Sequence, residues 1–329
     1  TGPLGLATSP AGGLFVADLA SRLLAFDRPF ATPLAPADTS GEGKSELVWR
    51  ATDGGFSLWT MDAFALTGFS YGVVGTEWSV AATGDFNGDG KADLFWRRND
   101  GALYIWYMDG RRPVAFTDAG IVPLEFTPVA VADFDGNGKA DVLFRRSTGE
   151  TYLWLMNDGG ILAQGFVGPT LGAEWAVQGA ADTNGDGRAD IVWRNATTGE
   201  AWVWTMNGLA TTSAAALAPT LGADWQVQGL ADFDGDGKAD ILWRRNDGDN
   251  YLWTLDGTAV AGYQQVPDAG PEWVIQGLGD LDADGRPDIV FRNAGTGEVY
   301  AWLMDGAAIR SAGSLGNPGA IWSIVQPRR

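Results

Sequence analysis

One acidic segment of nine residues recurs along the chain, and its spacing constrains the fold more than any other feature. The segment Asp-Phe-Asn-Gly-Asp-Gly-Lys-Ala-Asp occupies residues 85–93, and related copies occupy residues 133–141, 182–190, 232–240 and 280–288. Their first aspartates lie 48, 49, 50 and 48 residues apart, and a degraded copy at residues 38–46 begins 47 residues earlier. Self-similarity with a period of roughly 20–50 residues is typical of solenoids, propellers and similar arrays.

Each repeated unit contains four short segments with strand patterning. A Trp-led segment precedes the acidic loop, and an apolar run that ends in an aromatic residue and an arginine follows it. An alternating segment then carries two aromatic residues two positions apart, and a Met-Asp-Gly-like turn leads to a weaker apolar segment. Apolar alternation with a period of two predicts β-strands, and the short Gly-rich turns predict hairpins.

Four strands per unit predict an all-β fold, a β-propeller of four-stranded antiparallel blades. A solenoid needs capping ends, whereas a propeller closes on itself and hides its strand edges. The end of the chain, residues 321–325, matches only the first strand of a unit, and residues 6–8, 14–17 and 23–26 are three more strand-like pieces. We therefore expect a seven-bladed propeller of six full repeats and a closing blade built from both termini, with six blades as the alternative.

The predicted boundaries follow from this arrangement. Residues 1–329 form a single β-propeller, in which residues 1–32 supply the N-terminal strands of the closing blade and residues 318–329 its closing strand. The six repeats span residues 33–75, with the degraded loop, and then residues 76–123, 124–172, 173–222, 223–270 and 271–317.

Composition excludes several classes of function. The net charge of −19 disfavours binding to nucleic acid and to anionic membranes. The chain has no cysteine and no histidine, which excludes Cys/His zinc sites and catalysis by Ser-His-Asp or Cys-His groups. No run of 18 apolar residues is present, so no transmembrane helix and no membrane insertion are expected.

The spacing of oxygen-bearing side chains in the acidic loops predicts calcium sites. Positions 1, 3, 5 and 9 carry Asp or Asn, position 7 offers its backbone carbonyl, and the glycine at position 6 permits a sharp turn. An EF-hand would have Glu at position 12 between two helices, whereas Trp96 stands there and strands flank the loop. The predicted ligands are Asp85, Asn87, Asp89, Lys91, Asp93, Asp133, Asp135, Asn137, Lys139, Asp141, Asp182, Asn184, Asp186, Arg188, Asp190, Asp232, Asp234, Asp236, Lys238, Asp240, Asp280, Asp282, Asp284, Arg286 and Asp288.

The distribution of charge supports cations in these loops. The five intact loops carry 17 aspartates at the predicted ligand positions. Two like charges 4 Å apart repel by about 4 kcal/mol at an effective dielectric near 20, so folding should be coupled to the binding of about five Ca²⁺ ions. The alternative is that the loops are simple Asx turns. The degraded loop offers a weaker sixth site at Asp38, Ser40, Glu42 and Glu46. We expect these ions to be structural rather than catalytic.

The repeats resemble the FG-GAP/VCBS family over residues 33–317, because the pattern apolar-x-D-F-[ND]-G-D-G-K-x-D-[ILV], the period and the copy number agree. The resemblance implies a propeller similar to those of integrin α-subunits and of certain lectins, with calcium in a hairpin of each blade. It assigns the ligands to loop positions 1, 3, 5 and 9. Residues 5–18 look like an NHL-type strand pair, either in the closing blade or at the end of an upstream domain.

Two further sets of residues recur in register. One set is a ring of arginines that either binds acidic glycans or makes a repeated structural contact, namely Arg50, Arg97, Arg145, Arg194, Arg244 and Arg292. The other set stacks on sugar rings or packs within the propeller, and comprises the pairs Tyr104/Trp106, Tyr152/Trp154, Trp202/Trp204, Tyr251/Trp253 and Tyr300/Trp302. We expect the structural role in both sets.

These observations favour a secreted or cell-surface calcium-binding propeller, a lectin-like binding or adhesion module for carbohydrate or an extracellular protein. Millimolar extracellular calcium would fill such loops even at modest affinity. The alternative is a structural subunit or domain of a larger surface assembly. A polysaccharide lyase or hydrolase is less favoured, because the clustered carboxylates are committed to the loops. The chain is therefore predicted not to be an enzyme.

Overall fold

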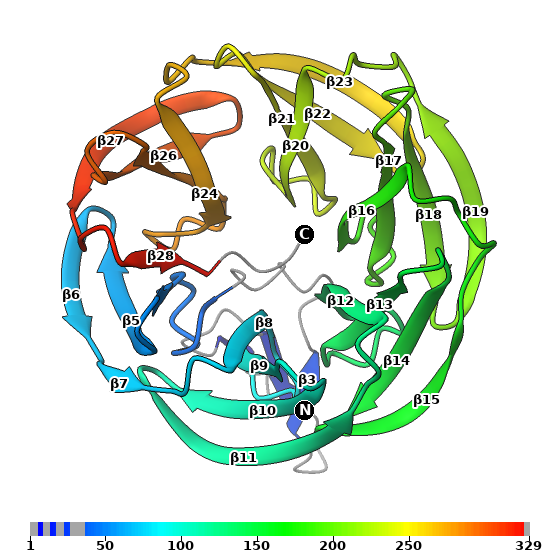
Figure 1. Ribbon diagram of the computed structural model, residues 1–329, viewed down its shortest axis with the longest axis horizontal. Helices are drawn as coiled ribbons and strands as arrows, with labels where there is room; N and C mark the ends of the chain where they lie inside the picture. Colours follow the sequence, from blue (N-terminus) through cyan, green and yellow to red (C-terminus); the bar gives the residue numbers. More distant parts are fainter. Residues whose placement is uncertain (1–5, 9–13, 18–22, 27–36, 326–329) are drawn as a thin grey trace, which may run out of the picture. The chain divides into compact units, whose positions relative to one another are not determined.

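The computed structural model describes residues 6–8, 14–17, 23–26 and 37–325. The chain divides into two compact units, residues 1–32 and 33–329. The first unit contains an antiparallel three-stranded sheet of order β1-β2-β3, formed by β1 (Leu6–Thr8), β2 (Leu14–Ala17) and β3 (Leu23–Phe26). In the second unit, six antiparallel sheets follow one another around a ring (Figure 1). Every regular element in the described residues is a strand, which confirms the all-β prediction.

Five of the six sheets are blades of four consecutive strands. The second blade contains β8 (Trp78–Gly84), β9 (Asp93–Arg98), β10 (Ala102–Asp109) and β11 (Arg112–Ile121). The third contains β12 (Phe126–Ala132), β13 (Asp141–Arg146), β14 (Thr151–Asn157) and β15 (Gly160–Phe166). The fourth contains β16 (Trp175–Ala181), β17 (Asp190–Asn195), β18 (Ala201–Asn207) and β19 (Ala210–Leu217).

The two remaining four-stranded blades repeat this order. The fifth contains β20 (Trp225–Ala231), β21 (Asp240–Arg245), β22 (Asn250–Asp256) and β23 (Ala259–Val266). The sixth contains β24 (Trp273–Gly279), β25 (Asp288–Asn293), β26 (Val299–Asp305) and β27 (Ala308–Gly316). In each blade the Trp- or Phe-led strand is innermost and the fourth strand is outermost (Figure 1).

The first blade closes the ring, because it combines strands from both ends of the second unit. It contains β4 (Leu47–Ala51), β5 (Gly55–Asp62), β6 (Ala65–Phe69) and β7 (Gly72–Val73), and β28 (Trp322–Ile324) is its innermost strand. The pairing of β28 with β4 aligns Trp322 with Ala51 and Ile324 with Trp49.

The seven-bladed prediction is therefore wrong, and the six-bladed alternative is confirmed. The three N-terminal strands form at the predicted residues, but they make a sheet of their own. The first repeat has no Trp-led segment before its acidic loop, so the inner edge of β4 lacks a sequence-adjacent partner. The C-terminal strand β28 pairs with this edge and thus completes the first blade.

The core lies between neighbouring blades. One cluster joins Phe95 and Ile105 of the second blade to Val142 and Phe144 of the third, and all four side chains are buried. The apolar second strands account for this, because their residues alternate between the two faces of a sheet that is covered on both sides. Each buried large apolar side chain contributes about 1.5–3 kcal/mol relative to an exposed one.

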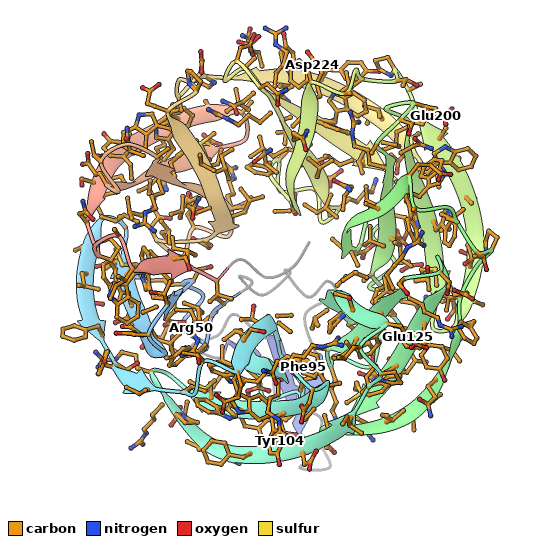
Figure 2. The ribbon with its side chains drawn as sticks, viewed as in Figure 1. Arg50, Phe95, Tyr104, Glu125, Glu200 and Asp224 are labelled. Atoms are coloured by element: carbon orange, nitrogen blue, oxygen red, sulfur yellow. The ribbon has the colours of Figure 1, made fainter. Side chains whose placement is uncertain are left out.

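Five of the six recurring arginines contact the connection to the next blade, in agreement with the structural role expected for the set. Arg50 of the first blade donates to the carbonyl oxygens of Val74 and Trp78, and its guanidinium lies 5.7 Å from the ring centroid of Trp96 in the second blade (Figure 2). Arg194 likewise donates to the carbonyl of Gly222. The related contacts to connecting carbonyls are made by Arg145, Arg244 and Arg292.

The acidic loops are also linked to one another. In five of the junctions, the backbone N–H at position 8 of one loop donates to the carbonyl at position 1 of the preceding loop, over 2.6–2.7 Å. These bonds join Ser45 to Asp280, Ala92 to Asp38, Ala140 to Asp85, Ala189 to Asp133 and Ala239 to Asp182. At the sixth junction position 8 is Pro287, which has no backbone N–H to donate.

No helix in the described part of the chain has the length and apolar character needed to cross a lipid bilayer.

Candidate metal centres

The first aspartate of each acidic loop organises the backbone around it. Asp85 accepts hydrogen bonds at Oδ1 from the N–H groups of Asn87, Gly88 and Asp89, and at Oδ2 from the N–H of Gly90. Gly90 adopts a φ of 83°, a conformation that favours glycine, so the position-6 glycine permits the turn as predicted. Equivalent bonds from positions 4 and 6 reach Asp133, Asp182, Asp232 and Asp280.

The aspartate at position 9 ties the loop to the third strand of the same blade. Asp93 is fully buried, and it accepts at Oδ2 from the N–H of Phe86 (3.0 Å) and at Oδ1 from the N–H of Met108 (2.9 Å). Equivalent bonds are made by Asp141, Asp190, Asp240 and Asp288. The aspartate at position 9 is buried because it is the first residue of the apolar second strand, which runs into the core.

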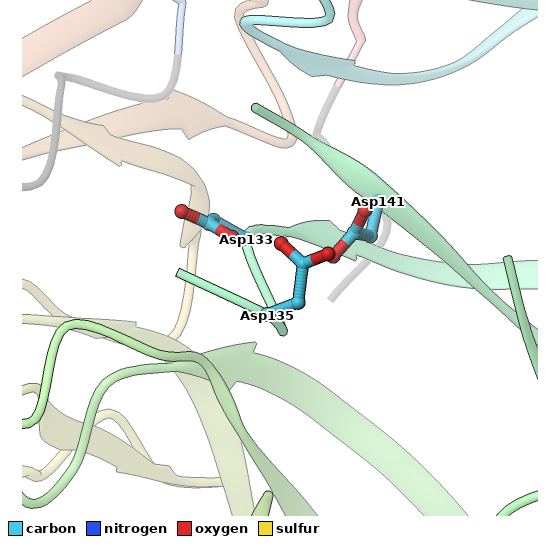
Figure 3. Close-up of side chains that lie close together, drawn as sticks. All are labelled: Asp133, Asp135 and Asp141. Carbon is cyan, nitrogen blue, oxygen red and sulfur yellow. The ribbon is translucent and has the colours of Figure 1, made fainter. Parts of the chain in front are cut away.

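The side chain at position 3 completes a convergent set of oxygens in three loops. Carboxylate oxygens of Asp133, Asp135 and Asp141 lie within 4.8 Å of one another (Figure 3). The same holds for Asp232, Asp234 and Asp240, and for Asp280, Asp282 and Asp288. A site with only oxygen donors, several of them carboxylates, matches the preference of a hard divalent cation such as Ca²⁺.

In the two remaining intact loops, position 3 is an asparagine that offers an amide oxygen. The Oδ1 atoms of Asn87 and Asn184 each accept the N–H of the residue at position 5, over 2.9 Å. Their amides therefore take part in the loop, and positions 1, 3 and 9 of these two loops hold two carboxylates, against three in the other three intact loops.

Positions 5 and 7 are not part of the convergent groups. At position 5, Asp89 accepts the N–H of Lys91 at Oδ1 over 3.0 Å, and the same bond recurs at Asn137, Asp186, Asp236 and Asp284. In four of the intact loops, the position-7 side chain forms an ion pair with an aspartate at, or just after, the end of the third strand of the same blade. Ion pairs of this kind join Lys91 to Asp109, Lys139 to Asp158, Lys238 to Asp256 and Arg286 to Asp305. The ligand roles of all these positions, including position 5 and the position-7 carbonyl, stay predictions.

Burial sets the electrostatics of the position-9 carboxylates. It raises the pKa of Asp93, Asp141, Asp240 and Asp288 to about 7 and that of Asp190 to about 6, although backbone N–H donors oppose the change. At position 1, burial likewise raises the pKa of Asp85, Asp133, Asp232 and Asp280. Hydrogen bonds alone thus do not offset the cost of these buried charges, and a bound cation would favour their ionised forms.

The first loop has the same backbone arrangement with different side chains. Asp38 accepts N–H bonds from Gly41 (2.7 Å) and Gly43 (2.6 Å), and the buried Glu46 takes the place of the position-9 aspartate. The Oε2 of Glu46 accepts from the N–H of Thr39 over 2.6 Å, and burial raises the pKa of Glu46 to about 7. Ser40 and Glu42 bring no carboxylate cluster around Asp38, so this loop fits a cation less well than the others.

The sixth loop contains a contact that the sequence did not suggest. The guanidinium of Arg310 on β27 pairs with Asp282 at position 3, and lies 2.9 Å from an oxygen of Asp284 at position 5. Arg310 is 28 residues from Asp282 along the chain, so no local motif relates the two. The only available signal was a single basic residue in a fourth-strand segment whose other residues are small or apolar.

Comparison with known proteins supports the repeat assignment. The FG-GAP-like repeat matches residues 85–144, 133–193 and 182–243, so three overlapping matches each join the acidic loop of one blade to the second strand of the next. None of the curated proteins compared with the chain matches it.

Two solved structures resemble the chain at low sequence identity. A chain of a nidogen/laminin complex is 13% identical, with a TM-score of 0.56, and the alignment covers 85% of this chain and 96% of that one. A catalytically inactive virginiamycin B lyase from Staphylococcus aureus, with quinupristin, is 10% identical, with a TM-score of 0.47 and coverages of 95% and 84%. The first of these likenesses supports the propeller fold alone. The matched repeats and the ring of six blades together identify the chain as a β-propeller that contains FG-GAP-like repeats.

Proposed function

We propose that the chain is a calcium-loaded β-propeller, in which about five Ca²⁺ ions occupy the intact acidic loops and stabilise the ring. The observation that carries this proposal is the convergence of three carboxylates within 4.8 Å in each of three loops. A cation there would neutralise buried carboxylates whose ionisation is otherwise unfavourable. The first loop, with Asp38, Ser40, Glu42 and Glu46, is a weaker site.

The role of the cation is structural in this proposal. Each position-1 and position-9 carboxylate already accepts backbone hydrogen bonds that hold the loop and the third strand together. A cation bound to the same oxygens would therefore lock a loop that is already formed. Catalysis is not proposed, because the chain has no histidine or cysteine and its clustered acids belong to these loops.

The propeller itself would act as a binding or adhesion module outside the cell. Its partner would be a carbohydrate or an extracellular protein, and lectin-like binding is the form the repeats favour. A net charge of −19 argues against nucleic acid and against anionic membrane surfaces. Millimolar extracellular calcium supports a secreted or cell-surface location, since it would fill loops of modest affinity. A structural subunit of a larger surface assembly is the second candidate.

Calcium titration tests the metal sites directly. The wild-type chain, freed of metal, should bind about five Ca²⁺ ions by isothermal titration, at sub-millimolar affinity or better. Asp135→Asn should lose or weaken one site, whereas Glu42→Gln in the first loop should leave the intact sites unchanged. Failure of the wild-type chain to take up calcium at 5–10 mM would contradict the proposal.

A binding screen separates the candidate roles. A glycan array probed in the presence of calcium should give reproducible hits if the chain is lectin-like, and none after chelation. Blank arrays together with stoichiometric recovery in a defined surface complex would favour the structural subunit. Turnover of a polysaccharide would contradict the non-catalytic role.

A further inference from the structure

One side chain sets the first blade apart from the other five. In each of those blades, the third strand carries a large aromatic residue opposite an aromatic residue of the second strand, as Tyr152 stands opposite Phe144. The equivalent pairs are Tyr104 with Trp96, Trp202 with Trp193, Tyr251 with Trp243 and Tyr300 with Phe291. In the first blade, the residue opposite Trp49 is Ser57.

In the five other blades, this aromatic side chain packs against the aromatic residue that leads the innermost strand. Ring centroids of Trp78 and Tyr104 lie 5.3 Å apart, and those of Trp225 and Tyr251 lie 5.6 Å apart (Figure 2 labels Tyr104). The remaining pairs are Phe126 with Tyr152, Trp175 with Trp202 and Trp273 with Tyr300, at 5.6–6.3 Å. The propeller thus fills this position with a six-membered ring five times.

Trp322, which leads the innermost strand of the first blade, also has no arginine opposite it on the neighbouring strand. An arginine guanidinium covers the leading aromatic ring in three blades, as Arg98 covers Trp78 at 5.2 Å and Arg245 covers Trp225 at 5.4 Å. The residue in register with Trp322 is Ala51. Trp322 is therefore opposite a small residue where those blades have arginine, and its blade has Ser57 where they have a tyrosine.

The missing ring leaves a slot of about 170 Å³ above Ser57. Its walls are the side chains of Trp49, Trp59, Phe69, Tyr71, Pro318 and Trp322. Tyr71 and Trp322 face each other edge to face with their ring centroids 6.2 Å apart. An apolar cavity of about 150 Å³ in another protein accommodates benzene, so this slot has room for one six-membered ring.

We propose that this slot receives an uncharged aromatic side chain, that of a tyrosine, from a partner polypeptide. The inference rests on the proposed role as a binding module and names the group that the module binds. A tyrosine ring in the slot would meet Trp322 as Tyr104 meets Trp78, and edge-to-face ring pairs contribute about 0.5–1.5 kcal/mol beyond their buried area. The net charge of −19 opposes a charged acidic group at this site.

The surroundings of the slot favour a polypeptide over a free small molecule. Phe69 and Tyr71, which line the slot, are 63% and 65% exposed, and Val73, two residues after Tyr71 in the chain, is 69% exposed, so apolar surface continues beyond the slot. A single free ring would leave this surface in water, whereas the residues that flank an aromatic side chain in a partner would cover it. Exposed apolar patches of this kind mark interaction sites.

The polar groups of the slot favour an aromatic ring over a sugar. The Oγ of Ser57 donates to the carbonyl of Ser70 over 2.5 Å, so the hydroxyl at the floor is already engaged. A pyranose would bring several hydroxyl groups among the rings of Trp49, Trp59 and Trp322. Burying hydroxyl groups without hydrogen-bond partners costs about 1–3 kcal/mol each in proteins.

A peptide-binding experiment tests the proposal. The calcium-loaded chain is titrated with the peptide acetyl-Gly-Gly-Tyr-Gly-Gly-amide, with the matched alanine peptide and with methyl glucoside, and binding is followed by saturation-transfer NMR and tryptophan fluorescence. The tyrosine peptide should bind saturably, at millimolar affinity or tighter, and at least tenfold more tightly than the other two probes. Binding of the glucoside alone, or equal binding of the tyrosine and alanine peptides, would overturn the proposal.

Three variants locate the binding. Ser57→Tyr places in the slot the ring that the other blades carry, and should weaken peptide binding at least tenfold. Tyr71→Ala removes an exposed wall and should weaken binding severalfold without affecting folding. Ser213→Tyr, on the exposed outer strand β19, adds a tyrosine elsewhere and should bind as the wild type does. Unchanged affinity in both Ser57→Tyr and Tyr71→Ala would overturn the assignment to this slot.

The melting temperature with and without calcium, measured on the same samples, keeps this proposal separate from the calcium proposal. A calcium-dependent melting temperature with no peptide binding would overturn the aromatic slot and leave the calcium sites supported. Peptide binding that Ser57→Tyr abolishes, in a chain whose melting temperature ignores calcium, would support the slot and contradict the calcium-loaded propeller.

Discussion

The first and fifth acidic loops share a backbone and differ in charge. Asp38 receives N–H bonds of 2.7 and 2.6 Å from positions 4 and 6, and Asp232 receives the same bonds over 2.7 and 2.8 Å. Position 3 differs, because Ser40 donates its hydroxyl to Asp38 over 3.1 Å, whereas Asp234 brings a second carboxylate close to Asp232. The loop conformation therefore does not require the carboxylate cluster, and the proposed cation would explain why the cluster is present.

Removal of calcium should have the largest effect on this comparison, because it acts on every intact loop at once. Each ion held at 100 times its dissociation constant contributes about 2.7 kcal/mol. With five sites, and about 2–4 °C per kcal/mol for a domain somewhat smaller than this one, chelation should lower the melting temperature by 15 °C or more. Calorimetry in calcium and in chelator measures the difference. Identical melting temperatures would mean that the five intact loops are no more cation-dependent than the first.

The pH dependence of the metal-free chain should be the next largest effect. Burial raises the folded-state pKa of Asp93, Asp141, Asp240 and Asp288 from 3.8 to about 7, so the folded state binds more protons than the unfolded state between these values. Stability is then highest at low pH, and it falls as the pH rises through 7. We expect the free energy of unfolding to decrease by about 3 kcal/mol or more between pH 5 and pH 8, as each pKa unit corresponds to 1.36 kcal/mol.

Calcium should suppress this pH dependence, because a bound cation keeps the carboxylates ionised. Urea unfolding at several pH values, with and without calcium, checks both parts. Metal-free stability that increased from pH 5 to pH 8 would contradict the assignment of the buried charges as uncompensated.

A matched pair of alanine substitutions compares the two loops individually. Asp38→Ala and Asp232→Ala each remove the acceptor of several backbone N–H groups, and each should cost about 2–3 kcal/mol in chelator. In calcium, the loss from Asp232→Ala should grow by the contribution of one ion, whereas that from Asp38→Ala should stay constant. Denaturant unfolding under both conditions measures the four values. A calcium-dependent loss in Asp38→Ala would place a strong site in the first loop.

Arg310 should produce the smallest effect. Its guanidinium pairs with Asp282 and Asp284, and a cation in the sixth loop would compete with it for the same carboxylates. Exposed ion pairs contribute about 0.2–1 kcal/mol, so Arg310→Ala should tighten calcium binding at this loop by about 1.5- to 5-fold. Site-resolved NMR titration follows Asp282 and Asp284, and Arg112→Ala, at the start of β11 in the second blade, serves as a control outside the sixth loop. Weaker calcium binding in Arg310→Ala would show that the arginine helps to organise the site.

The sequence was sufficient for the strands, the repeat and the loop turns, because these depend on local periodicity and on glycine at fixed positions. It failed on the number of blades, since a lone Trp-led strand can pair with any free sheet edge and only the register of β28 with β4 decides which. The slot above Ser57 shows the same limit. The sequence alone shows that Ser57 stands where the other repeats have an aromatic residue. The slot, however, is also lined by Trp322, which comes from the other end of the unit, and its position there could not be predicted from the sequence.

The closure of the ring by β28 has a mechanical consequence. The first blade is held shut by a ladder of three residues, with the N–H of Val325 donating to the carbonyl of Val48 over 2.7 Å at its end. A force that pulls on the C-terminal end of the chain would act first on the pairing of β28 with β4, because every other blade is a continuous stretch of polypeptide. Separating these two strands would strip Trp322 from Tyr71, so a stretched molecule would lose its aromatic slot while five blades stayed intact.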